Sequence, residues 1–451
     1  MKQNTMRRIL VGALLVASLP LCAADHVMRA AKHTDSSGRD VPATLNLSLE
    51  EAQNFAIEQN RSLKNASLAV QEAYAMRWQT IAAMLPQVDA SLGYTTYCGY
   101  EATMSMAGVP VTIAMPDYIS YGLTASVGVS GQGVVGAVLN DIAIQMQQIA
   151  LDASEDELRA NVKTGYVSLL VLQNMVALLD SSLTNVEELA EMTQRSVDVG
   201  AAEQTTADQI RVRANTIRNN IKQQERSIEL AKSSLKVLLD VPVETELVLT
   251  QTLEDVLSLD DILSLLGDHF NINNNHTYQQ LQKNTELAKT NVHMAAWAYG
   301  PMVSVAYQYT YQNYLAEGGF RMTPPNLVSL NLKMPLWSSG KRAAGVVEKK
   351  IALEEARHTL AETKDNLYIQ DQQLRYNLQN AYETFLTEKE NLNVTNRIFG
   401  STTNKFRYGS ASNLELINAS NDMITAQSSF VQAVLSLVKA EVELDKFLNN
   451  D

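Results

Sequence analysis

Cysteine is scarce in this chain of 451 residues, which carries only Cys22 and Cys98. At most one disulfide can form, so a disulfide framework is excluded. The histidines are scattered, and their spacing to one another and to the cysteines matches no metal site. Glycine-rich phosphate-binding loops and nucleophile motifs are also missing. The sequence therefore predicts no catalysis, no metal site and no cofactor.

Long apolar runs are also missing after the first 25 residues. A membrane-spanning part would therefore have to be built from strands, because no run reaches the length of a transmembrane helix. The formal net charge is −13 at pH 7. Since nucleic-acid binding depends on positive charge, this balance argues against nucleic acid as a partner.

The N-terminus has the three parts of a secretory signal peptide, predicted at 1–24 and followed by an extension at 25–47. The positive residues, the apolar run and the small residues near the cleavage site are Lys2, Arg7, Arg8, 9–19 and Cys22-Ala23-Ala24. A membrane anchor is the alternative, although the apolar run is short for one. Lipid modification of Cys22 also stays open, but Leu21 before it is bulkier than such sites prefer.

The chain resembles itself at two constant offsets, which indicates a duplicated unit. Pairs 215 residues apart include Asn60 and Asn275, Pro86 and Pro301, and Tyr94 and Tyr309. Pairs 209 residues apart include Ser130-Gly131 and Ser339-Gly340, Leu158 and Leu367, and Gly200 and Gly409. We therefore predict two structural repeats, 48–240 and 263–449, joined by a linker or equatorial segment at 241–262.

Proline is absent between Pro116 and Pro242 and after Pro335, so both stretches are free to form helices. Leucines repeat every seven residues there, which is typical of helices packed side by side as a coiled coil. The leucines in question are Leu151, Leu158, Leu172, Leu179, Leu353, Leu360, Leu367 and Leu374. We predict long helices at about 132–198 and 340–400, each about 100 Å long at 1.5 Å per residue.

Each long helical stretch is interrupted by a glycine, in Val199-Gly200-Ala201 and in Tyr408-Gly409-Ser410. Glycine adopts the left-handed conformation that ends many helices. A glycine tolerated inside a helix is the alternative, but its recurrence in both repeats favours a turn.

Four segments alternate apolar and polar residues, as strands with one apolar face do. They are 87–98, 118–129, 302–314 and 326–335. Their length fits tilted membrane strands, and ten of the 17 tyrosines lie in 94–121 and 299–314, as in the aromatic girdles of membrane barrels. A soluble antiparallel sheet is the alternative.

Four strands are too few to close a barrel, and open edges in lipid would leave backbone groups unpaired. The strands therefore predict an oligomer, in which three copies would give a barrel of about 12 strands. The expected fold class is mostly α with a membrane β portion, in which long helices continue the barrel as an α-helical tunnel.

Several short motifs then resemble those of the TolC-like outer-membrane efflux proteins, over 48–449. They are Leu49-Glu50-Glu51-Ala52 with Asn60, Leu85-Pro86, Met334-Pro335-Leu336-Trp337 with Gly340, Ala381-Tyr382 and Tyr408-Gly409-Ser410. The resemblance implies a homotrimer in the lipid of the bacterial outer membrane, with most of its helical mass in the periplasm. It also implies a passive exit duct of a tripartite efflux or type I secretion system. A periplasmic adaptor and an inner-membrane transporter would open that duct.

The resemblance assigns roles to three groups of residues. Gly200, Ala201, Gly409 and Ser410 would form the tip turns at which adaptors dock. Glu415, Asn418, Asp208 and Thr206 would lie at the periplasmic constriction, of which Glu415 and Asp208 are acidic. Pro335, Trp337 and Gly340 would form the joint from strand to helix, whereas Val129-Ser130-Gly131 departs from that pattern.

Two alternatives remain at this stage. A soluble periplasmic coiled-coil scaffold or adaptor would also contain long helices and a tyrosine-rich domain. For Glu415, the alternative is a solvent-facing position at the tip without a role in the constriction. The sequence does not identify the transported substrate.

Overall fold

The computed structural model describes residues 44–106, 108–114, 116–315 and 324–449. The predicted signal peptide at 1–24, with Cys22, and most of the extension at 25–47 lie outside them. The strands are β1 (Thr44–Leu47), β2 (Gln87–Thr95), β3 (Glu101–Met106), β4 (Val109–Ala114), β5 (Tyr118–Ser130), β6 (Glu246–Leu249), β7 (Met302–Tyr314) and β8 (Asn326–Lys333). The helices are α3 (Leu49–Gln59), α4 (Arg61–Ala82), α5 (Gly131–Asp198), α6 (Gln204–Leu239), α7 (Leu253–Val256), α8 (Leu259–Gly267), α9 (His276–Ala296), α10 (Lys341–Arg407) and α11 (Asn413–Leu448), with short 3-10 helices η1 (Ile272–Asn274) and η2 (Trp297–Tyr299).

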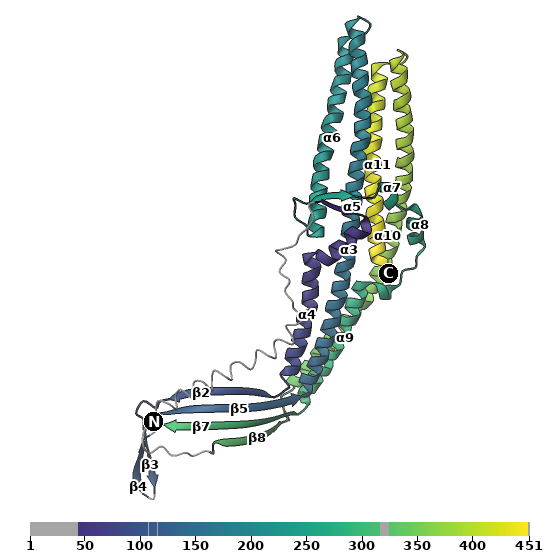
Figure 1. The fold of residues 1–451 in the computed structure, drawn as a ribbon. Coiled ribbons are helices and arrows are strands. Elements are labelled where there is room, and N and C mark those ends of the chain that lie inside the picture. Colours follow the sequence, from purple (N-terminus) through teal and green to yellow (C-terminus); the bar gives the residue numbers. More distant parts are fainter. Residues whose placement is uncertain (1–43, 107, 115, 316–323, 450–451) are drawn as a thin grey trace. The chain divides into compact units, whose positions relative to one another are not determined.

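The main sheet has four antiparallel strands in the order β2-β5-β7-β8 (Figure 1). Each predicted repeat supplies two of them, and β5 pairs with β7 where the two repeats meet. The ends differ slightly from the predicted ranges, since β2 stops at Thr95 and β8 at Lys333. Pro335 has no backbone N–H to donate, which agrees with the early end of β8.

The hairpin of β3 and β4 is absent from the sequence prediction. Ser105 pairs with Pro110 in this hairpin, and a proline within a strand argues against that assignment from sequence alone. The pairing is possible because, among the described strands, β3 and β4 pair only with each other, so the proline nitrogen faces no third strand. Gly108 has a φ of +86°, which suits the tight turn between the strands.

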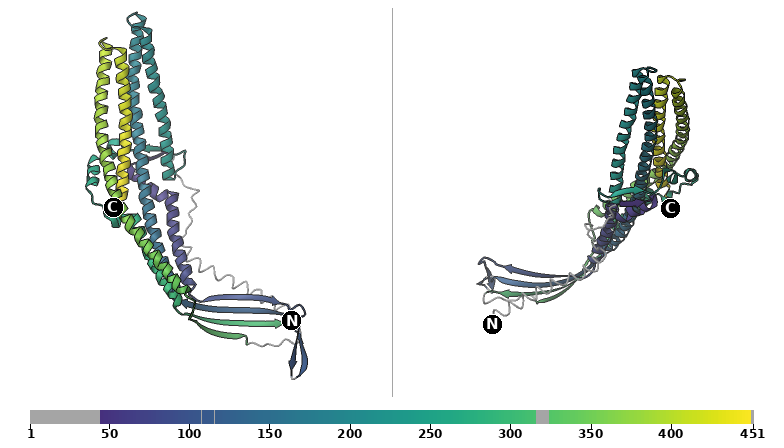
Figure 2. Two further views of the ribbon diagram at one scale, coloured as in Figure 1. Left: turned by 180° about the vertical axis from the view of Figure 1, so that it is seen from behind. Right: turned by 45° about the horizontal axis from the view of Figure 1, so that its top comes forward.

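Two helical hairpins make up the longest part of the fold. Helix α5 has 68 residues and α10 has 67, and each folds back through a short turn onto α6 or α11. The four helices run side by side, with both turns at the same end (Figures 1 and 2). Buried side chains such as Leu189, Ile217 and Met423 belong to one apolar cluster along this packing. Mostly helical structure with a small sheet confirms the predicted fold class.

One stretch of α5 is long and apolar enough to cross a membrane, by length and composition only. The stretch is not an uninterrupted apolar run, because polar residues such as Gln173 and Asn174 lie within it. Side chains of this helix, including Val167, Val171 and Leu179, are buried in clusters that also contain residues of other helices. A buried core helix passes the same test, so this stretch is weak support for a transmembrane helix.

The equatorial segment predicted at 241–262 contains β6, α7 and the first residues of α8. Thr44, Leu45 and residues 244–246 form a small unit of their own, in which Thr44 Oγ1 donates to the Glu246 carboxylate at 3.3 Å. Within the larger unit, the backbone N–H of Thr250 donates to the carbonyl of Leu47 at 3.1 Å.

Two buried asparagines show the duplication in atomic detail. Asn60 caps α4 by accepting from the N–H groups of Ser62 and Leu63, and its amide donates to the Leu238 carbonyl at 2.8 Å. Asn275 caps α9 in the same way, and its amide donates to the Phe447 carbonyl at 3.3 Å. Each asparagine therefore ties the start of one helix to the end of another, α6 in the first repeat and α11 in the second.

The same helix ends share a further feature. Asp240 after α6 and Asn449 after α11 both adopt left-handed backbone conformations, with φ of 54° and 45°. Asp240 forms an ion pair with Arg61 at 3.0 Å, whereas Asn449 lies 3.2 Å from the Nε2 of His276. The geometry is conserved between the repeats, while the chemistry of the contact has changed from an ion pair to a hydrogen bond.

We expect Asn60→Ala and Asn275→Ala each to destabilise the protein by about 1–3 kcal/mol, through the lost cap and the unpaired buried carbonyl. Urea denaturation of the detergent-solubilised protein would measure the change in midpoint. Ser258→Ala, which removes only the cap of α8, is the matched control and should cost less. Equal losses in all three variants would contradict the tie between helices.

Candidate functional site

One face of the four-stranded sheet is apolar across all four strands. The register aligns Leu92 with Tyr121, Tyr121 with Tyr311, and Val305 with Leu330. The other apolar residues on this face include Val88, Ile119, Leu123, Val127, Val129, Val303, Tyr307, Tyr309, Val328 and Leu332. Leu92, Val328 and Leu330 are 75%, 70% and 73% exposed. A face of this size left open to solvent marks a contact surface for lipid or protein.

The opposite face of the sheet is mostly polar. Alternation places Ser91, Thr124, Gln308 and Ser329 there, with further residues Asp89, Ser120, Ser126, Ser304, Thr310 and Asn331. One apolar and one polar face is the pattern of a membrane strand with lipid on one side and water on the other.

Strands β2 and β8 are the two edges of this sheet. Within the described residues, each pairs on one side only, so a row of backbone N–H and C=O groups on the other side has no strand partner. Such groups cost several kcal/mol each in the hydrocarbon part of a membrane. In lipid, a single sheet of this kind needs strands from another chain.

The two tip turns have the same backbone geometry. Gly200 and Gly409 adopt φ of +76° and +71°. The N–H of Gly200 donates to Val197 at 2.9 Å, and that of Ala201 donates to Ser196 at 2.7 Å. Gly409 and Ser410 make the equivalent bonds to Phe406 at 3.0 Å and Lys405 at 2.8 Å. This pair of bonds is the Schellman motif, in which a side chain at the glycine position costs roughly 1–2 kcal/mol.

A large apolar side chain stands immediately before each tip glycine. Val199 is 80% exposed and Tyr408 is 86% exposed. The repeat offset aligns them, so each hairpin presents an apolar residue at its end. Exposed aromatic and apolar side chains at such places are typical of protein contacts.

Glu415 lies in the first turn of α11, where it completes a capping box. Its carboxylate accepts from the backbone N–H of Ser412 at 2.6 Å and from the Ser412 hydroxyl at 3.1 Å. These bonds, the backbone bond first, hold the pKa of Glu415 below its usual range. The exposed carboxylate therefore stays ionised at neutral pH and also stabilises the helix start.

The other predicted constriction residues lie apart from one another. Asn418 is exposed on α11, one turn after Glu415. Asp208 is exposed on α6, where it accepts from Gln204 at 3.0 Å and lies 3.7 Å from Arg211. Thr206 instead lines a pocket of ≈ 360 Å³ between the two tip turns, together with Ala201 and Gly409. The structure thus brings three predicted residues together and leaves the charged ones at the surface.

Polar bonds join the two hairpins, and sequence reasoning missed all of them. Arg407 pairs with Glu188 at 3.0 Å, from α10 to α5. Arg213 donates to the Ser420 hydroxyl at 3.0 Å, from α6 to α11, and burial lowers the pKa of its guanidinium. Asn413 also donates to Gln209 across the same boundary. These partners are some 200 residues apart in sequence, so no local pattern could have paired them.

The joint after β8 has a folded core and an exposed corner. Gly340 caps α10 with a φ of +81°, and Arg342 donates to the Pro335 carbonyl at 2.6 Å and to Ser338 at 3.0 Å. Trp337, in contrast, is 87% exposed. Pro335 and Gly340 thus belong to an ordered, hydrogen-bonded turn, whereas the side chain of Trp337 is exposed.

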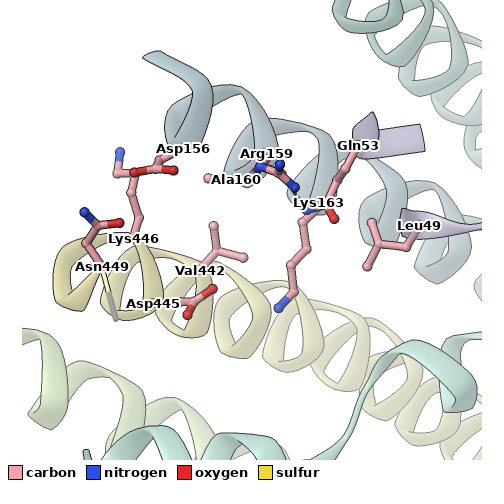
Figure 3. Close-up of a pocket in the computed structure, with 10 residues that line it drawn as sticks. All are labelled: Leu49, Gln53, Asp156, Arg159, Ala160, Lys163, Val442, Asp445, Lys446 and Asn449. Atoms are coloured by element: carbon pink, nitrogen blue, oxygen red, sulfur yellow. Dashed lines mark hydrogen bonds between the residues drawn. The ribbon is translucent and has the colours of Figure 1, made fainter. Parts of the chain in front are cut away.

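A charged pocket of ≈ 260 Å³ lies between α3, α5 and α11 (Figure 3). Three of its charged side chains already have partners within the chain. Lys163 pairs with Glu441 at 2.7 Å, Arg159 with Glu155 at 3.0 Å, and Asp156 with His276 at 2.7 Å. The pairs of Lys163 and Asp156 join α5 to α11 and α9, whereas the pair of Arg159 lies within α5. The charges of these three side chains are therefore already compensated without a ligand.

No group of three or more His, Cys, Asp or Glu side chains in the described part of the chain could hold a metal ion.

The sequence matches the family described as "Outer membrane efflux protein" over residues 54–240 and 271–450, which is more than half of the chain. Among solved structures, CusC is similar with a TM-score of 0.72 at 16% identity, covering 92% of this chain and 96% of that one. No match was found among curated proteins.

Two further outer-membrane proteins have the same fold. VceC of Vibrio cholerae gives a TM-score of 0.68 at 15% identity, covering 89% of this chain and 96% of its own. The open-state MtrE outer membrane channel of Neisseria gonorrhoeae gives 0.70 at 14% identity, covering 92% and 94%.

Proposed function

The chain belongs to the outer membrane efflux protein family, and on this premise we propose that three copies assemble into one closed exit duct. This family consists of outer-membrane channels rather than enzymes. The family match therefore favours an efflux channel over the alternative of a soluble scaffold or adaptor. Three copies of a four-stranded sheet would supply about 12 strands, a number that closes around a lumen.

The observation that carries this proposal is the apolar sheet face with two open edges. Lipid would cover the apolar face, and a strand of a neighbouring copy would satisfy each edge. The polar face, with Ser91, Thr124 and Gln308, would then line the water-filled lumen. The long hairpins of α5, α6, α10 and α11 would continue the lumen as a tunnel in the periplasm.

Cell fractionation followed by gel electrophoresis tests the assembly. We expect the protein in the outer-membrane fraction, released only by detergent and migrating as a trimer that heating converts to monomer. Open sheet edges in lipid provide the physical reason for this assembly. A monomer that is stable in the periplasmic fraction without detergent would contradict the duct.

We further propose that a periplasmic adaptor docks on the tips and couples the duct to an inner-membrane transporter. Val199 and Tyr408 stand at the ends of the hairpins, next to the turns of Gly200-Ala201 and Gly409-Ser410. Their exposure leaves apolar surface at the place that a periplasmic partner reaches first. The transporter would supply the energy, since the duct itself has no nucleotide-binding motif.

We expect Tyr408→Ala to weaken adaptor binding by on the order of tenfold or more, as truncating a central aromatic anchor does. Binding of the purified adaptor to the detergent-solubilised trimer would measure it. Leu230→Ala, at an exposed site of α6 away from the tips, is the control. Unchanged binding with Tyr408→Ala would remove this residue from the docking surface.

Glu415 is proposed to act at the narrowest part of the duct, where three copies of its charge would attract cations and slow their exit. We expect Glu415→Ala to raise single-channel conductance at low salt, with a smaller effect at high salt because ions screen the charges. Planar bilayer recordings would measure this change.

Ser412→Ala is the matched control, because it weakens the same helix cap while it keeps the charge of Glu415. An equal rise in conductance with Ser412→Ala would assign the effect to the cap. No change with Glu415→Ala would place Glu415 outside the constriction.

A further inference from the structure

Leu336 and Trp337 are the most exposed large apolar side chains that the structure describes, at 87% each. They lie in the connection 334–340 between β8 and α10, directly after an edge strand of the sheet. Neither the helical packing nor the turn formed by Arg342 covers them. Two adjacent side chains of this size outside a core call for a partner surface.

The strand directions fix which surface lies nearest in a closed assembly. Every neighbouring pair in the order β2-β5-β7-β8 is antiparallel, so β2 and β8 point in opposite directions. The β2 strand of the next copy can therefore pair antiparallel with β8, and the alternation continues unbroken. In that pairing the end of β8 lies beside the start of β2, which follows the joint at residues 83–86.

The register within the chain predicts the register between copies. Gln87 begins β2 and pairs with Ser126, just as Met302 begins β7 and pairs with Lys333. Ser126 in β5 and Lys333 in β8 therefore occupy equivalent places in the sheet register, whereas after the strands the sequence offset aligns Ser130 with Ser339.

Ser130 follows Ser126 by four residues and pairs with Met302, the first residue of the next strand in the sheet. Trp337 follows Lys333 by the same four residues. Lys333 is the last residue of β8, and Trp337 lies in the connection 334–340 that follows it. By this equivalence, the connection that contains Trp337 lies beside the first residue of the next strand beyond β8, which is Gln87 of the next copy.

The corresponding contact inside the chain is already filled by an aromatic ring. A Cβ atom added to Gly131, which follows Ser130, would lie 2.2 Å from the ring of Trp297. Trp297 belongs to the joint between α9 and β7. Within the chain, the aromatic ring therefore comes from the joint before β7, and the space that it fills lies at Gly131, in the joint after β5. Between copies, the joint before β2 supplies no such ring, because Ala82 stands at the position equivalent to Trp297. The ring would instead come from Trp337, in the joint after β8.

We propose that Leu336 and Trp337 pack against the joint between α4 and β2, residues 83–87, of a second copy, and so lock the closure of the assembly. This inference rests on the proposed trimer and adds the contact that seals it. Leu85 in that joint is 45% exposed and supplies the apolar surface. Trp337 and Leu336 would thus occupy between copies the place that Trp297 occupies within one.

Disulfide trapping tests the contact in the full-length protein. In a Cys98→Ser background, Gln87→Cys combined with Trp337→Cys should place one thiol on each side of the proposed contact, close enough for a disulfide to form. After mild oxidation, we expect most of the protein as covalent dimers and trimers on a non-reducing gel. Gln87→Cys with Leu327→Cys, at the far end of β8, should remain monomeric, as should each single variant.

Size-exclusion chromatography in detergent separates this inference from the proposed function. A trimer that gives no more cross-linking for the pair at 87 and 337 than for the control pair overturns the inference alone. Absence of any trimer overturns the proposed function as well. Cross-linking of the first pair only supports both.

Lipid is the other surface that could cover Trp337, and fluorescence distinguishes it. In vesicles of brominated phospholipid, we expect wild type and Trp337→Phe to lose the same amount of emission, because Trp337 is shielded by the second copy. Strong quenching that disappears in Trp337→Phe would show that the side chain faces lipid, and would overturn the proposed contact.

Discussion

A sheet that cannot complete its own hydrogen bonds is the constraint on which the rest of this structure depends. Its strands β2 and β8 pair on one side only in the described chain, and its apolar residues are open on one face. Water would satisfy the edges but not the face, and lipid would satisfy the face but not the edges. Only lipid together with neighbouring copies satisfies both. The membrane location and the oligomer therefore have the same physical cause, a sheet with unpaired edges and an exposed apolar face.

The duplication explains how two halves of different sequence supply equivalent strands and helical hairpins to one fold. Asn60 and Asn275 cap equivalent helices and reach equivalent carbonyls, although most residues around them have diverged. Gly200 and Gly409 likewise end the long helices with the same pair of backbone bonds. What the two repeats preserve is therefore backbone geometry at helix ends, where few side chains can substitute. What they have changed is the side chains at the joints, because the first repeat has Ala82 where the second has Trp297.

The sequence predicted those features that depend on local periodicity. Alternation over two residues located the strands of the main sheet, and the glycines before Ala201 and Ser410 located the turns. The hairpin of β3 and β4 was missed because Pro110 contradicts a strand locally, while a two-stranded ribbon tolerates it. The capping role of Glu415 was missed, although Ser412 three residues before it completes a capping-box pattern in the sequence. Pairs such as Arg407 and Glu188 had no local pattern at all, because the fold alone brings them together.

The strength of the contacts between the two helical hairpins determines how easily the duct could open at its tips. Within the tip cluster, helices bury side chains such as Leu189, Ile210 and Met423, each contributing about 1.5–3 kcal/mol. The boundary between the hairpins also carries polar bonds such as Arg407 to Glu188, with side chains 32% and 61% exposed. Exposed ion pairs contribute about 0–1 kcal/mol and weaken as salt rises. Near the tips, breaking these links therefore costs less than unfolding either helix. The same apolar cluster contains side chains of both hairpins, such as Leu189 of α5 and Met423 of α11. A partner that moves one hairpin relative to the other therefore has to separate part of this cluster as well as the polar bonds.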